Sequence, residues 1–332
     1  WDADGAAPVD GGTGGWDTTN IRWTADGSTY SAWDNAGNLN AYFAPAAGTV
    51  TLDAAITARS LTFATDGYVI DSSARDTNIL QLSGGGSGGP GAGTIDVPLA
   101  GATATIAAKL VGTTNLVKVG AGTLAFTGAQ DHRGGTLVSD GILDLSNGWL
   151  YSNGGWQNYA VRVENGAAIE VGGWADGDSL GIGKVAFGAG NLVIDGGTIR
   201  YTGSTTTNRP DRGFTIGANG ATMEAEGTNP WLLDKGRNFG INTTAGGRLT
   251  LGGSANGTMT MDLGGTGGLT KTGAGTWTVS GTNSYSGSTI VNGGALVLGS
   301  VSALGNTSGI TVSNGGTLDL AGYTPPGVGI TL

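Results

Sequence analysis

The chain has 332 residues, of which 67 are glycine and 8 are proline, and it contains no cysteine. Its net charge is −10, with 15 Lys and Arg against 25 Asp and Glu, which argues against binding to nucleic acid or to an anionic bilayer. The lack of cysteine excludes disulfides and thiolate metal sites, and no apolar run is long enough to span a membrane as a helix.

Aromatic residues gather at the start of the chain. They are Trp1, Trp16, Trp23, Tyr30, Trp33, Tyr42 and Phe43. A repeat protein needs atypical ends, because an open coil exposes its core and an unpaired strand edge. We therefore predict that residues 1–60 form an N-terminal cap or the first coils, with the aromatic rings sealing the core. Residues 61–332 are predicted to form the body, with a flexible glycine-rich loop at 83–93.

Short strands and tight corners dominate the body. Runs of four to six β-forming residues lie between Asn-Gly, Asp-Gly and Gly-Gly pairs, and apolar residues alternate with polar ones. The clearest runs lie at 161–171, 192–201, 290–298 and 310–320. Alternation with a period of two buries one face of a strand and leaves the other in water. Helical periodicity is nearly absent, because glycine interrupts almost every window.

A longer unit occurs twice. Residues 116–146 align without a gap to residues 269–299, at an offset of 153 from residue 116 to residue 269. The spacing of glycine and apolar residues is kept while other positions change. The matching glycines are Gly120, Gly122, Gly128 and Gly134 in the first copy, and Gly273, Gly275, Gly281 and Gly287 in the second. We predict that these are structural residues at corners that need a positive φ.

Repeats of this kind predict an all-β fold, a parallel β-solenoid in which each strand pairs with its copies in the adjacent coils. A β-propeller would need closed blades of longer strands. An antiparallel sandwich stays open as the alternative, because Asn-Gly and Asp-Gly pairs are also typical of hairpins.

The two copies resemble the passenger-associated repeat of bacterial autotransporters, the autotransporter-associated β-strand repeat. Residues 269–287 and 289–296 carry the resemblance, and residues 116–145 form a more divergent copy. The resemblance implies a single-stranded, right-handed parallel β-helix, exported to the outer cell surface of a Gram-negative bacterium. It implies little about activity, because such passengers include adhesins, aggregation factors, proteases and esterases.

Candidate catalytic residues are few. His132 is the single histidine, and the second copy has Tyr285 at the same position, so we predict a solvated corner rather than a general base. Glu224 and Glu226 would share one face of a strand. Paired carboxylates can serve glycoside hydrolysis, but we predict that these two only increase solubility. The sequence thus predicts no catalytic residue.

We expect no cofactor and no metal, with calcium as the one ion to consider. Asp2-Ala3-Asp4-Gly5 and Asp176-Gly177-Asp178 are weakly similar to calcium-binding loops. Neither has the further oxygen ligand and the bidentate glutamate of an EF-hand loop.

An aromatic segment follows the first copy of the repeat. It contains Trp149, Tyr151, Trp156 and Tyr159 among amide side chains. Aromatic faces beside amides suit sugar rings or protein partners, so these four residues are the ligand-binding candidates. The alternative is that the rings cover one side of a coil.

These observations together predict an extracellular structural or adhesive protein rather than an enzyme. Its expected partners are surface glycans, host or neighbouring-cell proteins, and further copies of the chain in a fibre. The alternatives are a glycan-binding module and a polysaccharide-degrading β-helix enzyme.

Overall fold

The computed structural model describes residues 1–84, 92–150, 160–173, 192–203, 213–235, 240–244, 246–313, 315–324 and 327–332. All regular elements in these ranges are strands, and the chain divides into two compact units, Trp1–Gly154 and Gly155–Leu332. The described residues include no helix that is long and apolar enough to cross a bilayer.

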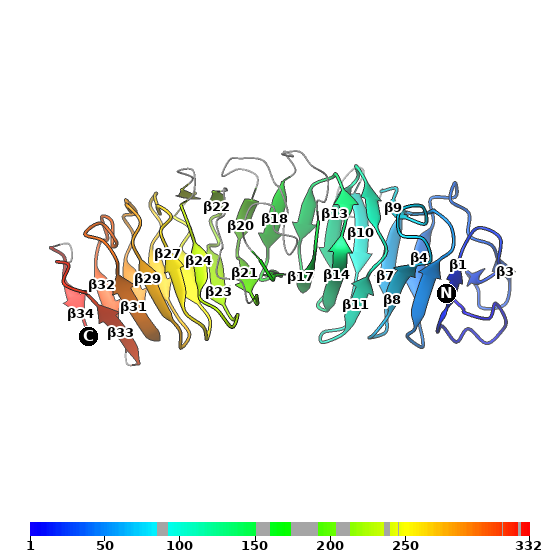
Figure 1. The fold of residues 1–332 in the computed structure, drawn as a ribbon, viewed down its shortest axis with the longest axis horizontal. Coiled ribbons are helices and arrows are strands. Elements are labelled where there is room, and N and C mark those ends of the chain that lie inside the picture. Colours follow the sequence, from blue (N-terminus) through cyan, green and yellow to red (C-terminus); the bar gives the residue numbers. More distant parts are fainter. Residues whose placement is uncertain are drawn as a thin grey trace. The chain divides into compact units, whose positions relative to one another are not determined.

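The first unit is built from three parallel ladders (Figure 1). One ladder contains β1 (Gly14–Trp16), β5 (Thr49–Leu52), β8 (Val69–Ser72), β11 (Thr103–Ile106), β14 (Thr123–Ala129) and β17 (Ile142–Trp149). The second contains β4 (Asn40–Phe43), β7 (Ser60–Phe63), β10 (Ala92–Asp96), β13 (Asn115–Val119) and β16 (Thr136–Val138). The third contains β6 (Ile56–Ala58), β9 (Leu80–Leu82), β12 (Leu110–Gly112) and β15 (Asp131–His132).

The second unit has the same construction. One ladder contains β19 (Ala168–Val171), β21 (Gly197–Tyr201), β23 (Ala221–Ala225), β26 (Leu249–Gly252), β28 (Leu269–Lys271), β30 (Thr289–Val291), β32 (Ile310–Val312) and β34 (Ile330–Thr331). Another contains β18 (Val161–Glu164), β20 (Leu192–Asp195), β22 (Phe214–Ile216) and β25 (Ile241–Thr243). The last contains β24 (Trp231–Leu233), β27 (Gly257–Met259), β29 (Thr276–Val279), β31 (Gly294–Leu298) and β33 (Gly316–Asp319).

The register explains the repeat in the sequence. Leu249 pairs with Leu269 and Leu269 pairs with Thr289, so a coil here takes 20 residues. Val50 pairs with Ile70 at the same spacing in the first unit. Each position therefore lies directly above its equivalent, and one residue type can form a continuous stack. The predicted parallel solenoid is confirmed, and the antiparallel sandwich is wrong.

Alternating side chains form the core. Strand β7 buries Leu61 and Phe63 completely, while Ser60 and Thr62 lie partly exposed between them. Burying each such large apolar side chain contributes about 1.5–3 kcal/mol. Because every coil adds a few of these residues to the same stack, the core grows in proportion to the number of coils.

The start of the chain departs from the regular coil. Strands β2 (Trp23–Thr24) and β3 (Tyr30–Ser31) form an antiparallel pair, although β1 already pairs in parallel with β5. The cap boundary at residue 60 stays a prediction. Within the predicted loop at 83–93, residues 85–91 lie outside the described residues.

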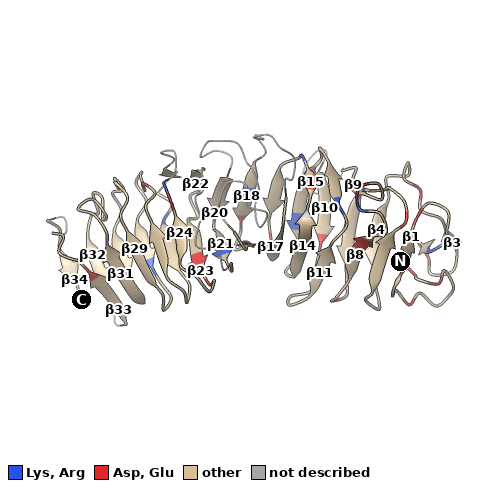
Figure 2. Cartoon of the chain, in the orientation of Figure 1, with Lys and Arg blue, Asp and Glu red and all other residues tan. Residues whose placement is uncertain are grey.

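Charged residues of opposite sign occur on neighbouring strands (Figure 2), and some of them form ion pairs between coils. Arg200 on β21 lies between Glu170 and Glu224 of the coils on either side, with N–O distances of 2.6 and 2.9 Å. All three are partly exposed, and ion pairs of this kind contribute about 0–1 kcal/mol each. These charges therefore align the coils more than they stabilise them.

Candidate functional site

The predicted aromatic segment is described only at its start. Trp149 ends β17, where its side chain is partly buried and its backbone carbonyl accepts a hydrogen bond of 2.9 Å from the amide of Gln130. Tyr151, Trp156 and Tyr159 lie outside the described residues. A ligand site on these four residues therefore stays a prediction.

The aromatic residues of the cap form one packed cluster. The rings of Trp16, Trp23 and Trp33 lie with centroids 4.6–5.0 Å apart, and Phe43 contacts Trp16 at 5.6 Å. All four are at most 8% exposed, as expected for rings that seal the core. Tyr42 differs from this expectation, because it is 56% exposed.

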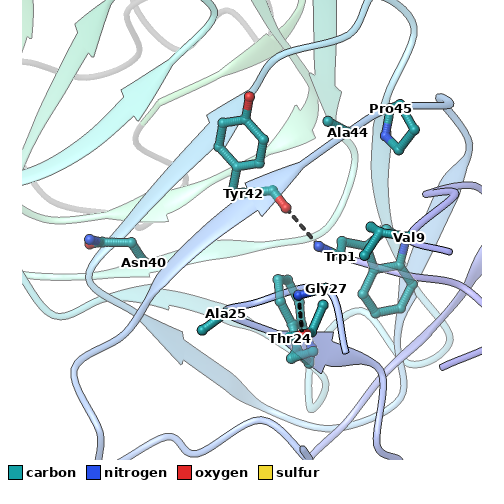
Figure 3. Close-up of a pocket in the computed structure, with 10 residues that line it drawn as sticks. Trp1, Val9, Thr24, Ala25, Gly27, Asn40, Tyr42, Ala44 and Pro45 are labelled. Atoms are coloured by element: carbon teal, nitrogen blue, oxygen red, sulfur yellow. Dashed lines mark hydrogen bonds between the residues drawn. The ribbon is translucent and has the colours of Figure 1, made fainter. Parts of the chain in front are cut away.

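A pocket opens beside this cluster (Figure 3). Its volume is about 230 Å³, and it is lined by Trp1, Val9, Trp23, Thr24, Ala25, Gly27, Asn40, Tyr42, Ala44 and Pro45. Drug-sized ligands occupy roughly 300–1,000 Å³, so this pocket suits a single ring or one protein side chain.

The pocket has an apolar base and polar edges. The indoles of Trp1 and Trp23 are nearly buried, whereas Tyr42 and Asn40 are exposed on alternate positions of β4. The terminal amine of Trp1 donates a hydrogen bond of 2.9 Å to the carbonyl of Tyr42, and its indole nitrogen donates one of 3.1 Å to Gly12. An aromatic surface with an adjacent amide can bind a sugar ring or an aromatic side chain. No sequence pattern predicts this pocket, because its residues come from four separate segments.

Three carboxylates lie close together in the cap. Ligand oxygens of Asp2, Asp4 and Asp10 are all within 4.8 Å of one another. The phenol of Tyr30 donates a hydrogen bond of 2.5 Å to Asp2, and this bond raises the pKa of Tyr30 to about 12. The hydrogen bond between Asp2 and Asp10 raises the pKa of Asp10. The other predicted acidic pair, Asp176 and Asp178, lies outside the described residues.

A lysine is buried at the same corner in both copies of the repeat. The Nζ atom of Lys118 donates to the carbonyls of Val119, Gly120 and Asp140, at 2.8, 2.7 and 3.1 Å. Both Lys118 and Lys271 are 0% exposed, and burial lowers the pKa of each to about 8.

The second lysine repeats this geometry. The Nζ atom of Lys271 donates to the carbonyls of Thr272, Gly273 and Gly293, the last two at 3.0 and 3.1 Å. These are the equivalents of the three acceptors in the first copy, 153 residues later. Each lysine therefore ties the corner of its own coil to the corner of the next coil. The two lysines occupy matching positions of the repeat in the sequence, but no sequence pattern predicts a role for them.

Glycine is required at the predicted corners for two different structural reasons. Gly120 and Gly273 have φ values of +78° and +69°, as predicted for left-handed corners. Gly122 and Gly275 do not have a positive φ. A Cβ at either position would lie 2.6 Å from the carbonyl oxygen of Leu99 or 1.8 Å from that of Ala255. Close approach to the preceding coil, not φ, requires glycine there.

The remaining glycines divide in the same way. Gly128 has a φ of +73°, whereas a Cβ at Gly281 would lie 2.2 Å from the carbonyl oxygen of Met261. At Gly134 and Gly287 a Cβ would lie 2.1 and 2.6 Å from backbone atoms of the preceding coil.

The prediction that His132 lies at a solvated corner is wrong. His132 is 1% exposed and its counterpart Tyr285 is 0% exposed, because both side chains point into the coil. Burial lowers the pKa of His132 to about 4. The neighbours Asp131 and Arg133 point outward and form an ion pair of 3.1 Å. The imidazole is thus a neutral core group at pH 7.

The predicted solubilising pair, Glu224 and Glu226, is engaged in contacts between coils. Glu224 accepts from Arg200 at 2.9 Å, and Glu226 accepts from the amide of Ser254 at 3.2 Å. Because each carboxylate is held by a structural neighbour, the geometry gives no support for a pair of glycosidase carboxylates.

Comparisons with known proteins agree with this architecture. The passenger-associated-transport-repeat family matches residues 116–145 and 269–298. The chain is 33% identical over 226 residues to the Adhesin BmaC autotransporter of Brucella suis biovar 1 (strain 1330). That alignment covers 62% of this chain and 6% of the length of the relative. No solved structure matches the chain. The predicted repeat is confirmed, and these similarities indicate display on the outer surface of a Gram-negative bacterium.

Proposed function

We propose that this chain is a non-enzymatic segment of a surface adhesin, and that the cap pocket contacts a partner on another cell. The observation that carries the proposal is the similarity to an autotransporter adhesin over 226 residues, together with the two passenger repeats. The solenoid would act as a stiff support, since each coil is bonded to the next through continuous ladders.

The cap pocket supports a glycan as the partner. Its aromatic base can stack against the apolar face of a sugar ring, while the exposed Asn40 and Tyr42 offer polar atoms at the edge. A pocket of about 230 Å³ would hold one ring of a longer glycan, so we expect weak single-site binding that gains strength from many copies on a cell.

The test is binding of beads coated with the 332-residue chain to a glycan array and to epithelial cells. We expect the double variant Asn40→Ala, Tyr42→Ala to lose most of the binding while it keeps the melting temperature of the parent. The matched control is Tyr323→Ala, which removes an exposed tyrosine in the second unit. Equal binding by the double variant and the parent would rule out the pocket, and no binding by the parent would rule out adhesion.

Self-association is a second candidate role. The outward faces of some coils carry small uncharged residues, such as Thr250 and Thr311. Charged residues are 12% of the chain, so electrostatic repulsion between copies is weak along such faces. We expect concentration-dependent assemblies in sedimentation velocity and ordered filaments in negative-stain micrographs. A single monomeric species over a hundredfold range of concentration would exclude this role.

A further inference from the structure

The carboxylate cluster of the cap has the geometry of a cation site. Calcium binds oxygen at about 2.3–2.6 Å, so two ligands of one ion lie at most about 5 Å apart. Ligand oxygens of Asp2, Asp4 and Asp10 satisfy this limit, with every pair within 4.8 Å. Three carboxylates at this distance repel one another unless a cation or a proton lies between them.

A buried oxygen atom is the second observation. The side chain of Asp2 is 0% exposed. Its Oδ2 atom accepts the hydrogen bond from Tyr30, whereas its buried Oδ1 atom has no hydrogen-bond donor among the described residues unless the Asp10 carboxyl carries a proton. Buried carboxylate oxygens are normally paired or bound to a metal, because burial removes the water that would otherwise stabilise their charge.

No basic side chain satisfies this oxygen. Within the described part of the chain, neither Lys nor Arg forms an ion pair with Asp2, Asp4 or Asp10. Arg22, an arginine of the cap, donates a hydrogen bond from its guanidinium to the carbonyl of Gly15 at 3.1 Å. The terminal ammonium of Trp1 interacts with Asp2, and it is one positive charge against three carboxylates.

The backbone holds the carboxylates in place. The amide of Asp2 donates to the carbonyl of Arg22 at 3.1 Å, and the amide of Ala3 donates to that of Gly11 at 3.0 Å. The carbonyl of Asp10 accepts from the amide of Ala46 at 3.2 Å. These bonds fix the segments that carry Asp2 and Asp10 to each other and to the cap, which reduces the ordering that binding would require.

We propose that Asp2, Asp4 and Asp10 bind one calcium ion that completes the N-terminal cap. The donors are all oxygen atoms, which calcium prefers, and the cluster contains no histidine or cysteine that would favour zinc. Magnesium requires near-ideal octahedral geometry at about 2.0–2.1 Å, which brings its ligands closer together than calcium does. The ion would neutralise the cluster and take the buried Oδ1 atom of Asp2 as a ligand. None of the three carboxylates lines the glycan pocket of the proposed function, although Asp2 and Asp10 directly follow the lining residues Trp1 and Val9.

The direct test uses terbium, which replaces calcium and luminesces when a nearby aromatic ring is excited. Tyr30 and Trp1 adjoin the cluster, so excitation of the 332-residue chain near 280 nm should give terbium emission that saturates at one ion per chain. Calcium should displace the terbium and should also raise the melting temperature. Absence of saturable emission would overturn the proposal, and so would equal displacement by magnesium and calcium.

Two exposed positions provide the matched variants. Asp10→Asn changes an exposed member of the cluster, and we expect at least a tenfold loss of terbium affinity without unfolding in the absence of metal. Asp26→Asn changes an exposed carboxylate of the same cap that bonds only to its own turn, and it should bind as the parent does. Equal affinity for the parent and Asp10→Asn would overturn the assignment. Adhesion and terbium binding are measured in separate assays. Failure of one proposal can therefore be told from failure of the other.

Discussion

The two copies of the passenger repeat place the same kinds of side chain at the same depth, although their outward residues differ. Leu116 pairs with Thr136 in the first unit, and Leu269 pairs with Thr289 in the second, so the register is identical. The lysine at the corner is buried in both copies and has equivalent acceptors. Both copies of the repeat therefore keep the buried lysine as well as the glycines.

The copies differ at two other buried polar positions. Gln130 accepts a hydrogen bond from the amide of Leu110 at 2.6 Å, and its counterpart Asn283 accepts from the amide of Leu263 at 2.8 Å. Asn283 also donates to the carbonyl of Ala303 in the following coil at 2.6 Å. The first copy has an imidazole where the second has a phenol, whose hydroxyl bonds to Thr289 at 2.7 Å. The side-chain amide of Asn283 thus connects its own coil to the coils on both sides.

The largest expected effect comes from removing the corner lysine. Lys118→Met keeps most of the aliphatic stem but leaves three carbonyls without the ammonium, so we expect a loss of about 4 kcal/mol in stability. Lys271→Met should cost the same in the second unit. Hydrogen exchange of peptides covering each corner, with urea denaturation of the whole chain, would measure both losses.

A lysine on the outer surface of the first unit provides the control for Lys118→Met. Lys109→Met removes a lysine of the first unit that pairs with the exposed Asp76 at 3.2 Å, and it should cost at most about 1 kcal/mol. If Lys118→Met were no worse than Lys109→Met, the ammonium would have no structural role and the stem alone would account for the burial.

Acid should destabilise the first copy more than the second. The expected loss of stability is slightly smaller than the loss from removing the corner lysine. His132 has a pKa of about 4 when folded and about 6.5 when unfolded, so the unfolded chain binds the extra proton between these values. Stability from this group is complete above pH 6.5 and falls by about 3 kcal/mol as the pH drops to 4. Tyr285, with a pKa raised to about 12 by burial, stays neutral throughout.

Hydrogen exchange at pH 7 and pH 4.5 would reveal this asymmetry. Peptides of the first copy should gain exchange at low pH by more than those of the second copy, after correction for the intrinsic rate. The variant His132→Gln should remove most of the difference between copies. The same acid response in that variant would mean that carboxylates, and not the imidazole, cause it.

Sequence patterns revealed the coils but not the polar core. Glycine spacing and alternation, as in residues 310–320, predicted the short strands correctly because corners and faces follow local chemistry. Lys118 was missed because lysine is normally a surface residue, and its only signal was its recurrence at Lys271. His132 could have been identified from alternation, since Asp131 and Arg133 flank it and point outward. The cap pocket could not, because it depends on how four distant segments pack.

The smallest expected difference between the copies is the difference in stability between the Asn283 and Gln130 variants. Asn283→Ala leaves the amide of Leu263 and the carbonyl of Ala303 unpaired in the core, so we expect a cost of about 3 kcal/mol. Gln130→Ala removes one strong hydrogen bond, the one from the amide of Leu110, and should cost about 1–2 kcal/mol. The second bond of Gln130 is weak, because its amide nitrogen lies 3.4 Å from the carbonyl of Thr127. Urea denaturation of both variants measures the difference. Equal costs would show that the bond to Ala303 adds nothing to stability.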